Sequence, residues 1–346
     1  MSEDSFTEVT SEGWFSRIGG AIKGVVVGIV IFAVGFPVLW LNEGRAVKTA
    51  KKINFAKENV VAISVDNVDR ANEAKLVQLS GKVKTADTLL DSVFGLSVNA
   101  IKLIRSVEIY QWEETVESKT VKKLGGKKET KKTYTYSKQW SSHLTNSNSF
   151  KKQNFVNSEG KTISHQNPSQ MKYTSSTQVA KNVKLGAFRL SDSLKNKISK
   201  ASNCIANKIP TSFNDPIQLV NGHYFIGKDA STPMVGDLKV KFKTVDAQDV
   251  SVMARQSGDK LGAYQTPFGS YEQLISGTVG VESMIATAES SNSTLTWALR
   301  VLGLILMVIG LVMVFKPLSV VADVVPFIGS FVEMGTGILA FLISIT

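Results

Sequence analysis

The segment IGGAIKGVVVGIVIFAVGFPVLWL, residues 18–41, decides the fold class because it is long, apolar and almost free of charge. A helix rises 1.5 Å per residue, so about 20 residues cross the ~30 Å hydrocarbon core of a bilayer. Its one charged residue, Lys23, lies near the start, where its ammonium can reach the interface. Trp14 and Trp40 bracket the segment, as interfacial aromatic residues do. We therefore predict a transmembrane helix over residues 18–41, after an N-terminal tail over residues 1–17.

The leader before this helix argues against a cleaved signal peptide. Residues 1–17 begin with an acidic stretch, whereas a signal peptide begins with a basic region. Bulky and polar residues, Trp-Leu-Asn-Glu at 40–43, stand where the small residues of a cleavage site belong. We expect the helix to be retained.

A second apolar block lies near the other end of the sequence. Residues 297–315 predict a second transmembrane helix, which Pro317 should end. An interfacial linker over residues 316–326 follows, and residues 327–346 form a third apolar segment. Glu333 lies inside this third segment, and a carboxylate at mid-bilayer costs about 3 kcal/mol. We therefore expect the third transmembrane helix to be incomplete.

Between the two blocks, residues 42–296 are polar and show the periodicity of strands. Apolar and basic residues alternate over residues 238–244, and apolar residues alternate again over residues 250–254. Residues 76–85 are a further strand candidate. The predicted fold is an α+β membrane protein, with transmembrane helices near both ends and a large β-rich extramembrane domain between the first and second.

Two elements of this domain can be predicted in detail. A hairpin joins Lys102–Ser118 to Thr130–Leu144 around Gly125 and Gly126, in a register that places Trp112 opposite Trp140 and Glu114 opposite Lys138. A helix is indicated where apolar residues recur at three- and four-residue spacing, with Ser191 or Asp192 as its N-cap. The apolar positions are Leu190, Leu194, Ile198, Ala201 and Ile205.

The residue types that carry most catalysis and metal binding are scarce. The one cysteine, Cys204, excludes an intrachain disulfide and a cysteine zinc cluster. The three histidines, His143, His165 and His223, are far apart and belong to no metal-binding motif. We predict no catalytic residue, no cofactor and no metal, and we predict that the protein is not an enzyme.

Seven lysines cluster at the predicted hairpin tip. They suit contact with anionic lipid headgroups, although lysines on a strand tip also serve as solvated residues that prevent edge association. A nucleic-acid partner is not expected, because the net charge of +11 comes without a matching fold signature. The lysines are Lys119, Lys122, Lys123, Lys127, Lys128, Lys131 and Lys132.

Three glycines share one face of the first predicted helix. Gly20, Gly24 and Gly28 are spaced by four residues, a pattern that permits close helix contact in membranes. We predict that the first and second helices pack together, with Gly24 or Gly28 at a protein contact. The alternative is that these glycines face lipid.

Several short blocks, in order along nearly the whole chain, resemble the transmembrane protein 43 (LUMA) family. The blocks are Gly13-Trp14, Arg17-Ile18-Gly19, Asn42-Glu43-Gly44-Arg45-Ala46, Leu79-Ser80-Gly81, Val107-Glu108, Tyr110-Gln111-Trp112, Asn167-Pro168-Ser169, Val235-Gly236-Asp237-Leu238, Ala254-Arg255-Gln256, Gly258-Asp259, Thr296-Trp297 and Pro326-Phe327.

The resemblance implies four membrane helices and a large domain between the first and second. This chain departs from that pattern, because it stops where the third helix should continue and has no fourth. The resemblance also implies residence in the endoplasmic reticulum or inner nuclear membrane of a eukaryote, whereas a bacterial protein would sit in the cytoplasmic membrane. It places the large domain on the lumenal side, while the basic residues after Arg45 favour the cytoplasmic side.

Three functions are open from the sequence. The leading hypothesis, which the resemblance implies, is a multispan membrane scaffold that organises membrane protein complexes through its β-rich domain. Its partners would be the bilayer, other membrane proteins and a second copy of the chain. The alternative is an oligomeric channel or transporter, with Arg300 and Glu333 lining the path. The third is an enzyme acting on lipid or peptidoglycan-like substrates, which requires a pocket lined by several titratable groups.

Overall fold

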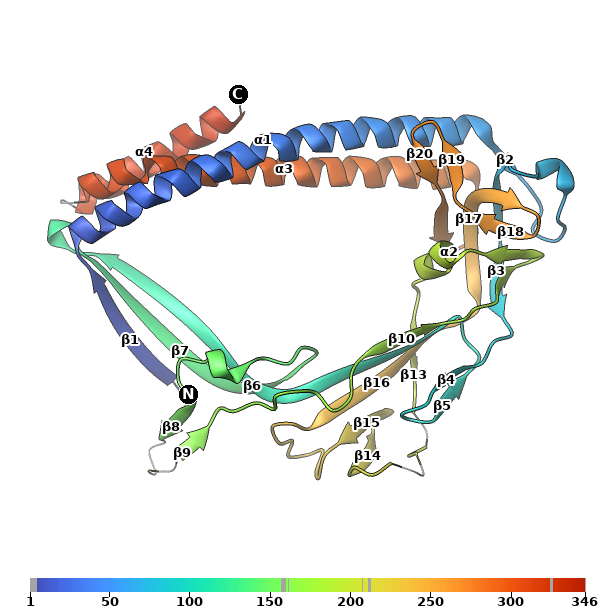
Figure 1. Ribbon diagram of the computed structural model, residues 1–346, viewed down its shortest axis with the longest axis horizontal. Coiled ribbons are helices and arrows are strands. Elements are labelled where there is room, and N and C mark those ends of the chain that lie inside the picture. Colours follow the sequence, from blue (N-terminus) through green and yellow to red (C-terminus); the bar gives the residue numbers. More distant parts are fainter. Residues whose placement is uncertain are drawn as a thin grey trace. The chain divides into compact units, whose positions relative to one another are not determined.

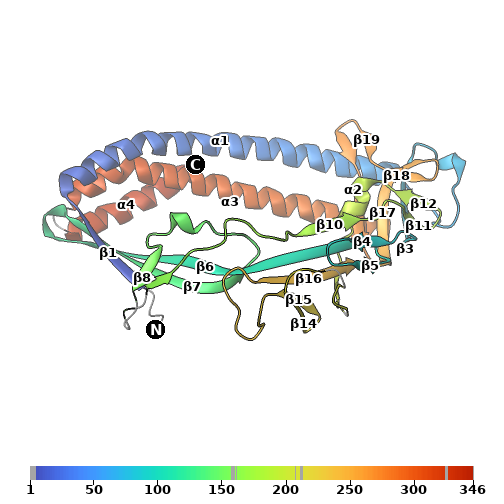
Figure 2. The same ribbon diagram turned by 60° about the horizontal axis from the view of Figure 1, so that its bottom comes forward.

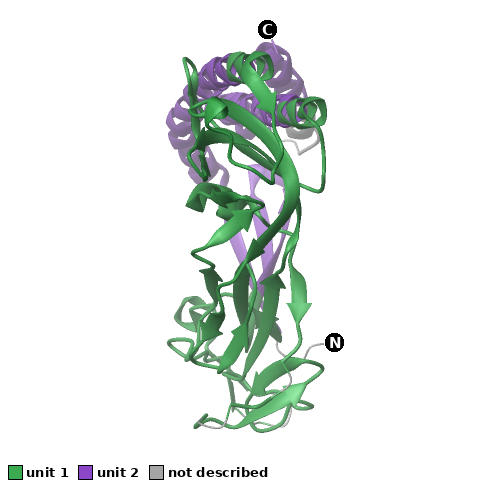
Figure 3. Cartoon of the chain, turned by 90° about the vertical axis from the view of Figure 1, so that its right-hand side faces the viewer, with its two compact units in different colours: residues 1–4, 51–114, 136–288 green, residues 5–50, 115–135, 289–346 purple. Residues whose placement is uncertain are grey.

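The computed structural model describes residues 5–156, 160, 162–206, 208–210, 213–323 and 326–345. The chain forms two compact units (Figure 3). One contains residues 51–114 and 136–288, and we call it the β unit. The other contains residues 5–50, 115–135 and 289–345, and we call it the helical unit.

Two long helices dominate the helical unit and run side by side (Figures 1 and 2). They are α1 (Trp14–Asn59) and α3 (Val281–Ala322), with 46 and 42 residues. Both are long and apolar enough to cross a membrane. Their apolar stretches are only 11% and 17% buried within the protein, so most of that surface is available to lipid. The predicted α+β membrane fold, with transmembrane helices near both ends, is therefore confirmed.

Both helices extend well past the predicted spans. At 1.5 Å per residue α1 is about 69 Å long, more than twice what a bilayer requires. Residues 42–59 and 281–296, which we expected in the β-rich domain, are helical. Ile53 and Ala56 of the first stretch are buried, and this packing stabilises a helix of otherwise polar sequence. The predicted membrane limits, 18–41 and 297–315, stay predictions.

Three expectations about the chain ends need correction. The predicted tail, residues 1–17, includes the strand β1 (Ser5–Glu12), which pairs with β7 (Lys128–Ser141). Pro317 does not end the second helix, because α3 continues to Ala322. Membrane helices tolerate proline where neighbouring groups satisfy the freed carbonyl. The predicted linker is therefore largely helical, and α4 (Pro326–Ile345) follows it.

The strands form two main sheets. The first has the order β1-β7-β6-β16-β15-β14, with β10 on β6 and β13 on β16. The second has the order β2-β3-β11-β12-β18-β17-β21, and β3 also pairs with β17, so five strands close on themselves.

The bounds in the first sheet are β6 (Lys102–Lys122), β10 (Ser176–Val179), β13 (Ser202–Cys204), β14 (Ile217–Val220), β15 (His223–Ile226) and β16 (Leu238–Val245). Those in the second are β2 (Val60–Ala62), β3 (Leu76–Thr85), β11 (Val183–Leu185), β12 (Phe188–Leu190), β17 (Gln248–Ser257), β18 (Lys260–Gly262) and β21 (Gln273–Ser276). The remaining strands are β4 (Leu89–Asp91), β5 (Leu96–Val98), β8 (Asn154–Val156), β9 (Thr162–Ser164), β19 (Tyr264–Thr266) and β20 (Gly269–Tyr271).

The core of the β unit lies between these two sheets. Leu79 and Val252 from the second sheet pack in one cluster with Leu103, Val107 and Phe242 from the first. The strands predicted at 76–85, 238–244 and 250–254 are confirmed as β3, β16 and β17.

The hairpin of β6 and β7 is confirmed, but its predicted register is wrong by two positions. Tyr110, rather than Trp112, lies against Trp140, with ring centres 5.2 Å apart. Lys138 lies over the ring of Trp112 at 4.8 Å. A two-residue shift keeps every side chain on its predicted face, so the alternation could not distinguish the two registers.

The predicted helix at 190–205 is much shorter than expected. The helix α2 (Asp192–Lys197) has Ser191 as its N-cap, whose hydroxyl accepts the Leu194 amide at 3.3 Å. The chain then leaves the helix, because residues 202–204 form β13 against β16. Strand pairing thus overrides the apolar spacing of the sequence.

A buried ion pair should contribute strongly to the stability of the β unit. Arg105 donates to both carboxylate oxygens of Asp91, at 2.9 and 2.8 Å, and both side chains are buried. Arg105→Met would leave Asp91 unpaired, so we expect the free energy of unfolding to fall by about 3–5 kcal/mol. Lys241→Ala removes a half-exposed pair with Glu108 and should cost less than about 1 kcal/mol. Denaturant unfolding in detergent, followed by tryptophan fluorescence, measures both, and equal effects would contradict the assignment.

Candidate functional site

Glycines bring α1 and α3 into backbone contact in the helical unit. A Cβ on Gly28 would lie 2.6 Å from the carbonyl oxygen of Gly310, closer than real Cβ contacts occur. A Cβ on Gly310 would meet the backbone nitrogen of Phe32 at 2.5 Å. The two helices therefore approach here to a distance that only glycine permits.

A second glycine pair extends this contact along the helices. A Cβ on Gly303 would lie 2.6 Å from a side-chain carbon of Leu39. A Cβ on Gly35 would clash with Met307 and lie 3.2 Å from the carbonyl oxygen of Gly303. We call these four residues, Gly28, Gly35, Gly303 and Gly310, the glycine seam. Gly28 contacts Gly310, whereas Gly35, later in α1, contacts Gly303, earlier in α3, so the two helices are antiparallel.

The predicted packing glycines coincide with the seam only at Gly28. A Cβ on Gly24 would lie 4.0 Å from the Met313 side chain, which is an ordinary van der Waals distance. Gly20 has only the Glu12 carboxylate near it, also at 4.0 Å. The sequence reasoning missed Gly35, Gly303 and Gly310, although a seven-residue spacing on each helix is a signal for them. A role for Gly20, Gly24 and Gly28 in helix association remains a proposal.

A polar network joins the helices where their apolar stretches end. Arg45 donates to Asn292 Oδ1 at 3.0 Å, to Asn42 Oδ1 at 3.1 Å and to Thr296 Oγ1 at 2.8 Å. Asn42 is buried and donates to the Thr296 carbonyl at 3.0 Å. We call Asn42, Arg45, Asn292 and Thr296 the polar lock. It gives a structural role to two sequence blocks that the family resemblance singled out.

One turn beyond Thr296 on α3, an ion pair also joins the two helices. Arg300 donates to both oxygens of Glu43, at 2.6 and 2.9 Å, and lies 4.8 Å from the ring centre of Trp297. The hydrogen bond from Arg300 lowers the pKa of Glu43, so the carboxylate remains ionised. This pair is half-exposed, so it orients the helices more than it stabilises them.

The opposite end of the helix pair is also fixed by polar contacts. Trp14 donates its indole N–H to the Val320 carbonyl at 2.8 Å. Arg17 pairs with Asp323, and both side chains are buried. The helix pair is thus locked at each end and closely packed at the glycine seam between.

The predicted lipid-contact lysines do not act as one free cluster. Lys122 is 3.0 Å from Asp323 and 2.6 Å from Glu333. Burial opposes its charged form, but the hydrogen bonds to these two carboxylates prevail and raise its pKa. Lys128 and Lys132 pair in register with Glu12 and Glu8 of β1, and Lys123 lies 3.5 Å from Glu129. Lys119, Lys127 and Lys131 are exposed. Lipid contact by these seven lysines remains a proposal.

The histidines and the cysteine lie apart from the helix pair. His165 is buried and stacks on Tyr136 at 4.2 Å, whereas His143 is exposed and His223 is half-buried. Burial raises the pKa of the Cys204 thiol, which disfavours the thiolate. Within the described residues, no three His, Cys, Asp or Glu side chains gather closely enough to hold a metal ion. We take the helix pair as the candidate site, because its contacts link residues far apart in the sequence.

Two features of the helical unit exclude each other in a bilayer. A span by residues 18–41 puts the leader and residue 42 on opposite sides. Among the described residues, the next helix able to cross is α3, which begins at residue 281. The chain between residue 42 and α3, including residues 128–135, therefore stays on the same side as residue 42. Yet β1 pairs with β7 from Ser5 to Glu12, which requires the leader and residues 128–135 on one side. An open ribbon of strands cannot cross the hydrocarbon core.

Substitutions in the glycine seam should separate the helices. Gly28→Leu or Gly310→Leu would force the backbones apart, because each Cβ meets backbone atoms that cannot move aside. The control is Gly20→Leu, where a Cβ would meet only the end of the flexible Glu12 side chain, at 4.0 Å. We expect disulfide formation between cysteines at Ala46 and Asn292, in a Cys204→Ser background, to slow at least fivefold in the seam variants only. A rate in Gly28→Leu equal to that of the control would count against the seam.

The leader strand offers a test of membrane topology. Glu8 and Lys132 are directly paired in the β1–β7 register, so cysteines at both positions are within disulfide reach. Because we take residues 18–41 to span the bilayer, we expect this disulfide in detergent-solubilised protein and not in membrane-inserted protein. Efficient crosslinking in intact membranes would show that α1 does not cross.

The chain is similar over most of its length to known proteins of one family. A family model described as Transmembrane protein 43 matches residues 109–346. Transmembrane protein 43 of Mus musculus is 33% identical over 360 residues, which cover 99% of this chain and 87% of the relative. The Homo sapiens protein is 32% identical, and the alignment covers 96% of this chain and 83% of the relative. A Drosophila melanogaster homolog is 27% identical, and the alignment covers 92% of this chain and 85% of the relative. No solved structure matches. The chain belongs to the transmembrane protein 43 family.

Proposed function

We propose that this protein is a multispan membrane scaffold that organises membrane protein complexes through its β-rich domain. The observation that carries the proposal is the continuity of the helices with the domain core. Ile53 of α1 and Met284 and Ile285 of α3 pack in one buried cluster with Leu76 and Met253 of the second sheet. α1 thus continues as one helix to the residues that pack in this cluster, and α3 continues as one helix from them, as suits a domain that positions partners.

The lipid-facing surface of the helices supports the same proposal. Large apolar side chains outside the glycine seam are exposed, among them Val26, Val30, Leu302 and Ile305. In a bilayer these can contact acyl chains or the helices of other membrane proteins, including a second copy. The compartment we propose is the endoplasmic reticulum or inner nuclear membrane in a eukaryote, or the cytoplasmic membrane in a bacterium.

The channel alternative has less support. Arg300, one of the two ionisable groups that would line a path, is already paired with Glu43. Within the described helices, the predicted spans otherwise contain only Lys23 as a charged residue. An enzyme would require a pocket with a free acid or base. The β unit has a pocket lined by titratable groups, but most of them are cationic.

Copurification from native membranes tests the scaffold proposal. Tagged protein should enrich specific membrane proteins over an unrelated multispan protein, in at least two detergents and in nanodiscs. Gly28→Leu should lose part of this set while Gly20→Leu keeps it, because only the former disturbs the helix pair. Absence of enrichment in every medium would overturn the proposal. Ion flux in proteoliposomes that disappears in Glu333→Ala would favour the channel instead.

A further inference from the structure

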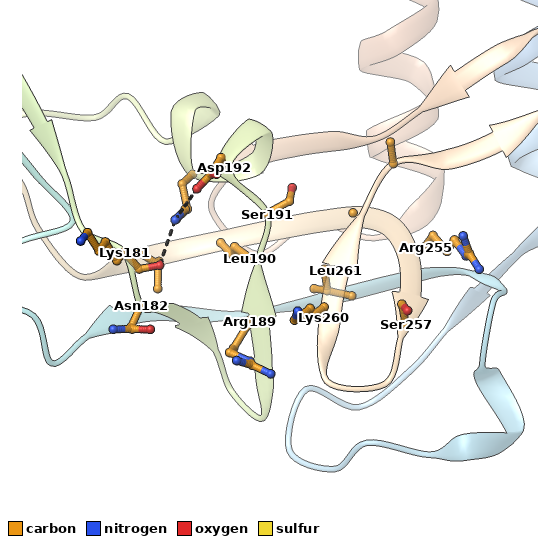
Figure 4. A pocket seen from close by; sticks show the side chains of 14 residues that line it. Lys181, Asn182, Arg189, Leu190, Ser191, Asp192, Arg255, Ser257, Lys260 and Leu261 are labelled. Carbon is orange, nitrogen blue, oxygen red and sulfur yellow. Dashed lines mark hydrogen bonds and ion pairs between the residues drawn. The ribbon is translucent and has the colours of Figure 1, made fainter.

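A pocket in the β unit is lined by an excess of positive charge (Figure 4). It has a volume of about 440 Å³ and lies around the parallel pair β12 and β18, where Arg189 pairs in register with Lys260. Residues that precede β11 and residues of β17 complete the lining. A cavity of this size suits a small-molecule ligand.

Five lining side chains are cationic, and one is a carboxylate. Two cations are already neutralised: Arg189 by Asp259, at 2.7 and 2.8 Å, and Lys195 by Asp192, at 2.6 Å. Within the described residues, the other three form no ion pair within 4.0 Å, although Lys260 interacts electrostatically with Asp259. They are Lys181, Arg255 and Lys260.

The three unpaired cations come from separate elements whose positions are fixed by the fold. Arg255 lies on β17 opposite Gly262, and Lys260 lies on β18, which β17 pairs. Lys181 is held from the other side, because its carbonyl accepts from the buried Lys195 at 2.9 Å. Lys260 lies between Lys181 and Arg255 in the view of Figure 4. Like charges that line one pocket repel, and an anion in the pocket offsets that repulsion.

The lining also favours binding over chemistry. The hydrogen bond from Lys195 lowers the pKa of Asp192, so this carboxylate is ionised and engaged. Asn182 and Ser257 add neutral polar groups. Arginine and lysine with neutral donors match the oxygens of a phosphate group, which accepts several charge-assisted hydrogen bonds.

We propose that this pocket binds a phosphate-bearing ligand of headgroup size, with Lys181, Arg255 and Lys260 as its contacts. The site lies apart from the glycine seam and the polar lock, so the proposal stands without the scaffold function. The phosphate can belong to a soluble metabolite or to the headgroup of a phosphoinositide lipid. Both present the same chemistry to the pocket.

The test uses the full chain in neutral phosphatidylcholine nanodiscs. Inositol trisphosphate is titrated by calorimetry into wild type and Arg255→Gln/Lys260→Gln. The matched control is Lys84→Gln/Lys228→Gln, which removes two exposed charges outside the pocket. We expect the pocket variant to bind at least tenfold more weakly and the control to bind like wild type. Unchanged melting temperatures would show that the variants fold.

A second arm distinguishes the two sources of phosphate. Tighter binding to nanodiscs or vesicles that contain a phosphoinositide than to the soluble headgroup supports a lipid ligand. Equal affinity for both supports a soluble ligand. Binding of neither probe at millimolar concentration, or equal binding by wild type and the pocket variant, would overturn the proposal.

Discussion

The close approach of α1 and α3 at the glycine seam is the contact on which the membrane part of this protein depends. Two apolar helices in lipid gain nothing from the hydrophobic effect when they associate, so contact must come from dispersion and hydrogen bonds. Dispersion falls steeply with distance, and Gly28 with Gly310 reduces that distance to backbone contact. The polar lock then selects one register, because sliding would leave the guanidinium of Arg45 without its acceptors.

Both helices continue past the predicted membrane spans without a break. Glycine seam, polar lock and the buried cluster at Ile53 and Met284 follow one another along the same two helices. The β unit adds its own rigidity through the closed ring of β3, β11, β12, β18 and β17. α1 and α3 each run without a break from the glycine seam to the buried cluster of the β unit.

Much of this architecture could be predicted from local sequence. Hydropathy located both long helices, and strict alternation at 238–244 located β16. Features that depend on distant parts of the chain could not be predicted. The register of the β6–β7 hairpin is one, because a two-residue shift leaves every side chain on the same face. The end of α2 is another, because β13 pairs with a strand that is distant in the sequence. The site was found in part. Gly28 followed from four-residue spacing, whereas Gly35, Gly303 and Gly310 became evident only when the partner helix was in place.

Hydrogen exchange of the chain in nanodiscs tests the central claim most directly. If α1 and α3 continue as one packed pair out of the membrane, backbone amides of residues 46–56 and 284–294 should be protected to a similar degree. Protection in both segments should fall together in Gly28→Leu, since the helices stabilise each other. Fast exchange of either segment in the wild-type protein would mean that a flexible linker joins membrane and domain, and the account would be wrong.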